Sequence, residues 1–292
     1  MKPLQQWLAE GEAVTVGGHA VFVHRSGAGP WLTLLHGFPT SSWDWAAIEP
    51  ELARHFRILA FDFLGFGASD KPGHHRYSIS GQTDLTVALW QHFGIGETAI
   101  LAHDYGATVA QELLARHNQG CDLPALRSVV LLNAGLYPHL HRALPAQKLL
   151  ASRLFGPLAV RLVTRGLFLR GLRRIFSPDH PPTADQLDQF WQNVCRHNGH
   201  RLSHRLLGYI HDRRRSAHRF AAALTVTDIP IGYIWGLADP VSGSAMAGEI
   251  RRRHPDAAIT ELADVGHYPQ IEAPDRVTAA ALAYLTRTPA AD

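Results

Sequence analysis

Short apolar segments typical of β-strands alternate along this chain with segments of helical periodicity. The strand segments are found at 31–36, 56–61, 98–102, 128–132, 229–235 and 258–262. Helical spacing of apolar residues is found at 83–93, 107–117, 245–253 and 278–285. Because strands that alternate with helices pair in parallel, the pattern predicts a mostly parallel, twisted α/β sheet with helices on both faces. Near the N-terminus, 13–16 and 20–23 flank Gly17-Gly18 and predict a hairpin.

The composition is that of a globular protein that can bury its own core. The chain has 292 residues, of which 46% are hydrophobic and 18% are charged. No apolar run reaches the roughly 20 residues that cross a bilayer, so we expect no transmembrane segment. The N-terminus lacks the apolar core of a secretory signal, and Cys121 and Cys195 are too few for a disulfide framework. We therefore expect a cytoplasmic location.

Residues 136–225 interrupt the alternation of strands and helices. This segment is rich in Leu, Arg and His at helical spacing and has no clear strand. It holds 15 Lys and Arg against 4 Asp and Glu, whereas the rest of the chain holds 13 against 21. We interpret it as a basic helical cap inserted into a core made of 1–135 and 226–292. Its charge fits either a solvated basic face or a positive field that attracts an anionic substrate or a membrane surface.

The segment Ala102-His103-Asp104-Tyr105-Gly106 lies directly between a predicted strand and a predicted helix. Small residues two positions before and after the central one are typical of a nucleophile elbow, a turn too tight for bulky side chains. Such a turn lifts the central side chain above the carboxyl edge of the sheet, where open α/β sheets bind ligands. The carboxylate of Asp104 can attack carbon and form an ester with the enzyme. An ordinary polar turn is the alternative.

A second motif, His36-Gly37-Phe38-Pro39, ends the predicted strand at 31–36. A turn at this position can aim the backbone N–H of Phe38 at the space above Asp104. The N–H of Tyr105 is a second donor, at the start of a helix whose dipole also favours an anion. The two amides predict an oxyanion hole, and a simple strand-ending turn is the alternative.

Two further polar residues follow strands late in the chain. Asp239 lies in the segment 235–240, and His267 lies in the segment 264–269. A carboxylate on a strand-end loop is well placed to orient a histidine, although an Asp-Pro turn is common in itself. The chain order of nucleophile, acid and histidine is the order found in α/β-hydrolases. We predict Asp104, Asp239 and His267 as the catalytic residues.

Together these motifs resemble α/β-hydrolases of the epoxide hydrolase and haloalkane dehalogenase subgroup, over nearly the whole chain. Similarity to the mesoderm-specific transcript type of hydrolase is carried by 103–106, 109–114, 147–150, 239–241 and 266–270. The resemblance implies an α/β-hydrolase fold with an inserted helical cap. It also implies that Asp104 attacks the substrate carbon and that His267 activates water. The HGxP motif of epoxide hydrolases is similar to the segment that begins at His36, which we therefore place in the substrate site.

The chain differs from dehalogenases at two positions that hold the leaving halide. Those enzymes usually carry Trp after the nucleophile and often Asn after the His-Gly pair, where this chain has Tyr105 and Phe38. Trp191 of the predicted cap is our candidate for a replacement halide ligand. Epoxide hydrolases instead use cap tyrosines to protonate the epoxide oxygen. The predicted cap offers Tyr137 and Tyr209, and we expect Tyr209 to point into the site. A core tyrosine with a local hydrogen bond is the alternative for Tyr209.

We therefore expect a hydrolase that acts through an alkyl ester on Asp104, without cofactor or metal, and with an epoxide as substrate. A haloalkane or haloacid dehalogenase is the alternative enzyme. A ligand-binding or membrane-peripheral protein without catalysis is the alternative of another class. The expected partner is a small molecule, anionic in the haloacid case, and the basic cap is a candidate for peripheral membrane contact. We expect no nucleic acid, and the oligomeric state stays open.

Two arginine runs, 213–215 and 251–253, are interpreted as solvated charge. The alternative is that one cap arginine binds a carboxylate of the substrate, although the sequence does not indicate which. His197, His200 and His204 have a spacing that places three histidines on one helix face, but no carboxylate or Cys partner accompanies them.

Overall fold

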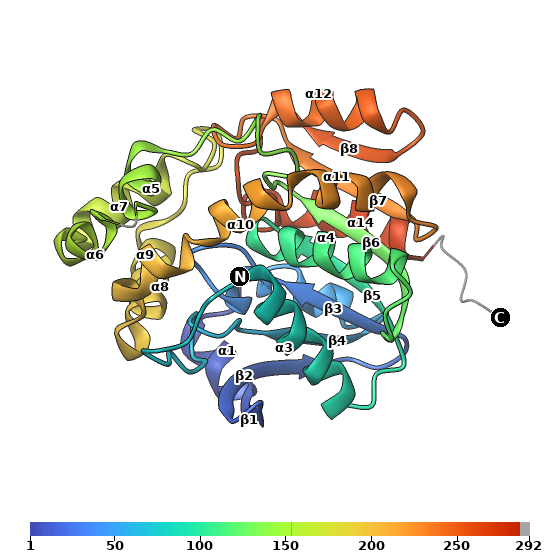
Figure 1. Cartoon of the computed structure of the whole chain (residues 1–292), viewed down its shortest axis with the longest axis horizontal. Coiled ribbons are helices and arrows are strands. Elements are labelled where there is room, and N and C mark those ends of the chain that lie inside the picture. Colours follow the sequence, from blue (N-terminus) through green and yellow to red (C-terminus); the bar gives the residue numbers. More distant parts are fainter. Residues whose placement is uncertain (153, 287–292) are drawn as a thin grey trace.

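A single eight-stranded sheet runs through the molecule, and helices cover both of its faces (Figure 1). The computed structural model describes residues 1–152 and 154–286. In spatial order the strands are β1 (Glu12–Val16), β2 (His19–Ser26), β4 (Arg57–Phe61), β3 (Trp31–Leu35), β5 (Glu97–His103), β6 (Ala125–Leu132), β7 (Ile231–Gly236) and β8 (Ala258–Leu262). β1 and β2 form the predicted hairpin, β2 is antiparallel to β4, and all other neighbours pair in parallel. The predicted α/β fold is confirmed.

The sheet separates two apolar cores because successive side chains of each strand point to opposite faces. In β5, for example, Ile100 and Ala102 join one core, whereas Ala99 and Leu101 join the other. The first core is covered by α3 (Ile79–His92), α4 (Tyr105–Asn118), α11 (Ala217–Val226) and α12 (Ser244–Arg253). The second is covered by α1 (Leu4–Glu10), η1 (Ser42–Trp45), α2 (Glu49–Leu52), α13 (Pro269–Glu272) and α14 (Pro274–Leu285).

Local capping hydrogen bonds determine where helices begin, and the spacing of apolar residues does not predict these bonds. α3 begins at Ile79, before the predicted start at residue 83, because the Ser78 hydroxyl accepts a bond from the N–H of Gly81. The periodicity also did not predict α1. This helix buries Leu4 and Trp7, and the Trp7 ring stacks on His24 with ring centres 3.7 Å apart. Tertiary packing therefore defines an element that is too short to show a clear period.

The segment predicted as a cap forms helices between β6 and β7. They are α5 (Pro145–Leu150), α6 (Gly156–Ala159), η2 (Val160–Leu162), α7 (Arg165–Arg173), α8 (Ala184–Cys195), η3 (Arg196–Leu202), α9 (Ser203–Leu206), α10 (Tyr209–Arg215) and α11. α5, α6 and α7 stand out from the rest of the molecule at its left side in Figure 1. α11, by contrast, packs against α4 on the sheet. None of the helices that the structure describes is long and apolar enough to cross a membrane.

Candidate active site

Asp104 occupies the tight turn between β5 and α4, as the sequence predicts. Its backbone is left-handed, with φ 44° and ψ −103°, a conformation that non-glycine residues adopt only when their surroundings hold them there. Gly106 shows what holds it. A Cβ on Gly106 would lie 2.3 Å from the carbonyl oxygen of Leu35 in β3, and the Gly106 N–H donates to the His36 carbonyl over 2.9 Å. The turn is therefore packed directly onto the neighbouring strand.

The His36-Gly37-Phe38-Pro39 turn places a backbone donor on the Asp104 carboxylate. The N–H of Phe38 donates to Asp104 Oδ2 over 3.1 Å. The turn is held by the buried ring of His36, whose Nε2 accepts from the N–H of Phe63 over 3.0 Å and whose Nδ1 donates to the Gly37 carbonyl over 2.8 Å. Both ring nitrogens of His36 are thus engaged within the protein. In this structure His36 positions the turn, and its predicted contact with substrate stays a prediction.

Asp239 and His267 lie together, as predicted. His267 Nδ1 donates to Asp239 Oδ2 over 2.8 Å, which fixes the ring and leaves Nε2 for chemistry. The same carboxylate accepts from the Ser242 hydroxyl over 2.6 Å, from the Val241 N–H over 2.7 Å and from Asn133 Nδ2 over 3.0 Å. Burial raises the pKa of Asp239, but His267 and these donors outweigh burial and hold it below its usual range.

Asp104 and His267 influence each other's charge. Burial raises the pKa of Asp104 above its usual range, against the opposing charges of His267 and Arg213 and the Phe38 N–H. Burial lowers the pKa of His267, but the charge and hydrogen bond of Asp239 and the charge of Asp104 outweigh it and raise the pKa to about 9. His267 is therefore a cation beside two carboxyl groups at neutral pH. Neutralising Asp104 would remove one of the interactions that keep the proton on His267.

The raised pKa of His267 predicts how stability depends on pH. The folded state binds the His267 proton more tightly than the unfolded chain does. Protonated His267 therefore stabilises the fold fully below about pH 6.5, and this stabilisation is lost as the pH rises through about 9. It is worth about 3 kcal/mol of unfolding free energy. We expect wild type to lose stability relative to His267→Gln between these pH values, as measured by urea unfolding.

The exposed residue His55 supplies the control for this measurement, since its side chain is about half accessible. His55→Gln should follow the wild-type pH profile. Parallel profiles for wild type and His267→Gln would contradict the assignment of the raised pKa to His267.

Two buried polar residues that the sequence reasoning missed support the histidine and its acid partner. His103 Nε2 bonds to the His267 carbonyl at 2.7 Å, so the residue before the elbow positions the histidine loop. Asn133 donates to Asp239 and to the Gly236 carbonyl, and its own Oδ1 accepts from the Gly236 N–H over 2.7 Å. Asn133 directly follows β6, so its place after a strand was a usable signal.

Tyr209 of the cap lies against the two residues whose N–H groups are the predicted oxyanion donors. Its buried ring lies with its centre 4.9 Å from the Tyr105 ring and 6.2 Å from the Phe38 ring. Burial and the charge of Asp104 raise its pKa above the usual range, so the phenol keeps its proton. The other cap tyrosine, Tyr137, bonds to His254 at 2.9 Å instead. Trp191 contacts the rings of Phe168 and His200 and none of the three predicted catalytic residues.

Arg213 contradicts the interpretation of its arginine run as solvated. Its neighbours Arg214 and Arg215 are exposed, but Arg213 is 1% exposed. Its guanidinium lies 5.0 Å from the centre of the Tyr209 ring, and Nη1 and Nη2 have no hydrogen-bond partner among the described residues. Its charge offsets part of the rise that burial causes in the pKa of Asp104. A buried cation therefore lies near the carboxylate of the elbow.

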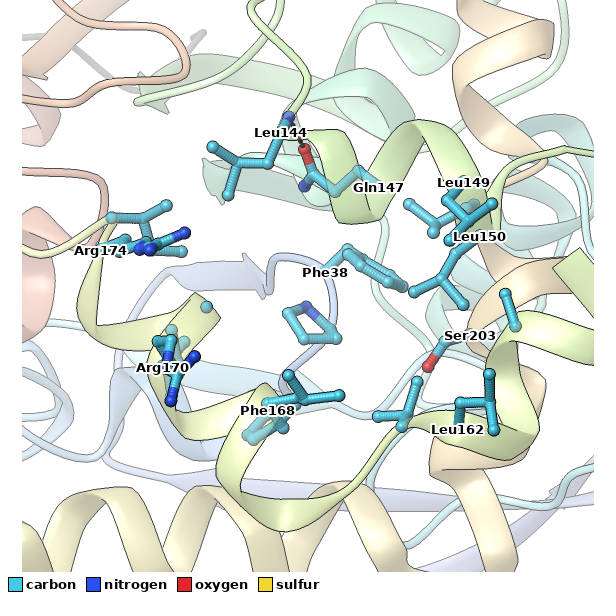
Figure 2. A pocket seen from close by; sticks show the side chains of 18 residues that line it. Phe38, Leu144, Gln147, Leu149, Leu150, Leu162, Phe168, Arg170, Arg174 and Ser203 are labelled. Carbon is cyan, nitrogen blue, oxygen red and sulfur yellow. Dashed lines mark hydrogen bonds between the residues drawn. The ribbon is translucent and has the colours of Figure 1, made fainter.

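A cavity of about 510 Å³ lies between the core and the helices that follow β6. Asp104, Asp239 and His267 do not line it, but Phe38, whose N–H donates to Asp104, and Pro39 do. Figure 2 shows Phe38 facing the cap side chains around it. Most of the lining is apolar, with Gln147, Arg170, Arg174 and Ser203 as polar exceptions. The spaced histidines do not line it.

Those histidines do not share a helix face, because His197 is left-handed with φ 48°. Within residues 1–152 and 154–286, no group of three or more His, Cys, Asp or Glu is placed to hold a metal ion.

A carboxylate at a strand–turn–helix junction, a backbone donor beside it and an Asp–His pair are an arrangement typical of α/β-hydrolases. Residues 30–274 match the sequence profile of the alpha/beta hydrolase fold family, and the chain belongs to that family.

Known proteins with this fold include both types of enzyme that the motifs resemble. The chain is 42% identical to LipZ of Mycobacterium tuberculosis, over 97% of this chain and 98% of LipZ. It is 39% identical to the human mesoderm-specific transcript homolog protein, over 93% of this chain and 84% of that protein. A solved haloalkane dehalogenase, the DbeA-M1 variant from Bradyrhizobium elkanii, superposes with a TM-score of 0.79 at 20% identity, covering 95% of this chain and 96% of that one. The solved epoxide hydrolase CorEH shares the fold as well.

Proposed function

We propose that this α/β-hydrolase opens an epoxide through a covalent ester on Asp104. The observation that carries the proposal is the hydrogen bond from the Phe38 N–H to Asp104 Oδ2, because it leaves Oδ1 to attack. Attack on an epoxide carbon forms the C–Oδ1 bond and breaks the C–O bond of the ring. The electron pair of that bond goes to the ring oxygen, which takes the proton of Tyr209 and becomes a hydroxyl.

The second step hydrolyses the ester. Formation of the ester removes the charge of Asp104, which lowers the pKa of His267. The imidazolium then gives its proton to the Tyr209 phenolate, which restores the phenol and leaves His267 neutral and able to act as a base. His267 takes a proton from water, and the hydroxide attacks the ester carbonyl carbon. The oxygen already held by Phe38 becomes the oxyanion, stabilised by the N–H groups of Phe38 and Tyr105. Collapse breaks the bond between the carbonyl carbon and the alkyl oxygen, and that oxygen takes the proton of the added hydroxyl. This releases the diol and restores the Asp104 carboxylate, while the proton taken from water stays on His267 as in the starting state.

Tyr209→Phe tests the epoxide proposal. Without the phenol proton the ring oxygen leaves as an alkoxide, so we expect ester formation from an epoxide to slow by about 10²–10³. Ester formation from a haloalkane, which needs no proton, should change less than about threefold on the same principle. Rapid-quench measurement of single-turnover ester formation compares the two. Tyr137→Phe is the matched control, since Tyr137 bonds to His254 away from the site. An equal loss with both substrates would contradict the role of Tyr209 as acid.

Arg213 favours a second candidate function, dehalogenation of a haloacid. The buried guanidinium faces the Tyr209 ring, and its two Nη groups have no hydrogen-bond partner among the described residues, so an anion would stabilise it further. The carboxylate of a haloacid would do so while Asp104 displaces the halide from carbon. Arg213→Gln should then raise the KM of a haloacid and leave the KM of a neutral haloalkane unchanged. A protein that binds such ligands without turnover is the remaining alternative, and it would show saturable binding with no product.

A further inference from the structure

Six large apolar side chains between residues 149 and 167 of the cap are exposed. They are Leu149, Leu154, Phe155, Leu158, Leu162 and Leu167, and we call them the apolar patch. Leu154 is 81% exposed and Leu162 is 72% exposed. Among residues 1–152 and 154–286, Met1 and Val226 are the other large hydrophobic residues exposed to a comparable degree. Isolated exposed apolar residues are ordinary, but a group of this size marks a binding surface.

The apolar patch lies among basic residues without acidic counterparts. Arg161, Arg170, Arg173 and Arg174 are exposed, and in the part of the chain that is described none of them forms an ion pair. Arg165, which lies in the same stretch of sequence, forms an ion pair with Asp188. From residue 136 to residue 178 the sequence contains eight Arg and Lys and no Asp or Glu. The positive charge around the patch is therefore not neutralised by neighbouring side chains.

We propose that the apolar patch and its arginines dock on the surface of an anionic lipid bilayer. Leucine and phenylalanine side chains insert at the boundary between headgroups and acyl chains, while arginines contact lipid phosphates. The combination of apolar side chains and unpaired arginines favours a bilayer over a second copy of the chain or a nucleic acid. A second copy of the chain, related by twofold symmetry, would bring the same positive arginines against each other. A nucleic acid would satisfy the arginines and leave the central apolar side chains without a partner.

The apolar patch adjoins the cavity, so docking on a bilayer would affect how a substrate enters. Leu149, Leu162 and Leu167 belong to the apolar patch and also line the cavity that ends at Phe38. A molecule dissolved in the bilayer would therefore meet the mouth of this cavity without crossing water. Docking itself does not depend on the reaction proposed for Asp104.

Vesicle co-sedimentation of the full chain tests this surface. The probes are phosphatidylcholine vesicles with and without roughly one third phosphatidylglycerol, at low and at high salt. We expect binding that needs phosphatidylglycerol and weakens with salt. The triple variant Leu154→Ser, Phe155→Ser and Leu158→Ser should bind at least about tenfold more weakly, since it removes the inserted apolar surface. Arg170→Glu with Arg173→Glu should lose the phosphatidylglycerol dependence.

Val226→Ser is the matched control, because Val226 is 68% exposed outside the apolar patch. It should bind like wild type. Unchanged melting temperatures verify that the variants fold, and turnover of a water-soluble substrate by the triple variant separates docking from chemistry. Absence of wild-type binding, or equal binding by wild type and the triple variant, would overturn the proposal. So would a dimer in sedimentation velocity that the triple variant dissolves while vesicles stay unbound.

Discussion

Replacing Asp104 by Asn is expected to reduce turnover by about 10⁴-fold or more, because the amide cannot attack carbon as the carboxylate does. The variant should nevertheless fold. Burial raises the pKa of Asp104, which means that the fold disfavours the ionised carboxylate, and a neutral amide of the same shape removes this cost. We therefore expect a Tm at or above that of wild type together with the loss of activity. Steady-state turnover and thermal unfolding measure the two effects.

Asp84→Asn serves as the control for this substitution. The exposed Asp84 of α3 pairs with Arg116, which lies near the end of α4 opposite the elbow. Its turnover should match wild type. Wild-type turnover by a folded Asp104→Asn variant would show that Asp104 is not the nucleophile.

Replacing Gly106 by Ala is expected to cost on the order of 3 kcal/mol of unfolding free energy. The added Cβ would lie 2.3 Å from the carbonyl oxygen of Leu35, and that backbone atom belongs to a central strand that cannot easily shift. The same clash separates the elbow from β3, so the Phe38 donor and Asp104 also lose their alignment. Urea unfolding measures the loss of stability, and turnover of the folded fraction measures the misalignment.

Gly248→Ala in α12 is the matched control, since nothing lies within 4 Å of its added Cβ. In a helix interior this change should stabilise by up to about 1 kcal/mol. If both alanine variants unfolded at the same urea concentration, close packing of the elbow on β3 would not be what fixes the turn.

The sheet and the Asp104–Asp239–His267 site were predictable because their signals are local. Each of these residues follows an apolar strand, and the strand pattern by itself places all strand ends on one edge. Asn133 follows β6 in the same way, but an amide neither attacks carbon nor takes a proton from water, so its residue type did not mark it as a catalytic candidate.

Properties that depend on how one helix is turned toward another were not predictable. Arg213, Arg214 and Arg215 read alike in the sequence, but the packing of α10 buries the first and exposes the others. His36 has the residue type of a substrate ligand, whereas its two hydrogen bonds to backbone are visible only in the fold. α1 is stabilised by Trp7 on His24, a contact between distant segments.

The covalent ester on Asp104 is tested most directly by the intact mass of the His267→Gln variant. Without its base the ester should form and persist. Incubated with pooled epoxides, haloalkanes and haloacids, the variant is predicted to gain the full mass of an epoxide. Capture of a haloalkane or haloacid would instead add the substrate mass less that of the hydrogen halide. The His267→Gln, Asp104→Asn double variant should gain nothing. No adduct from any probe, or an adduct that persists in the double variant, would contradict the account.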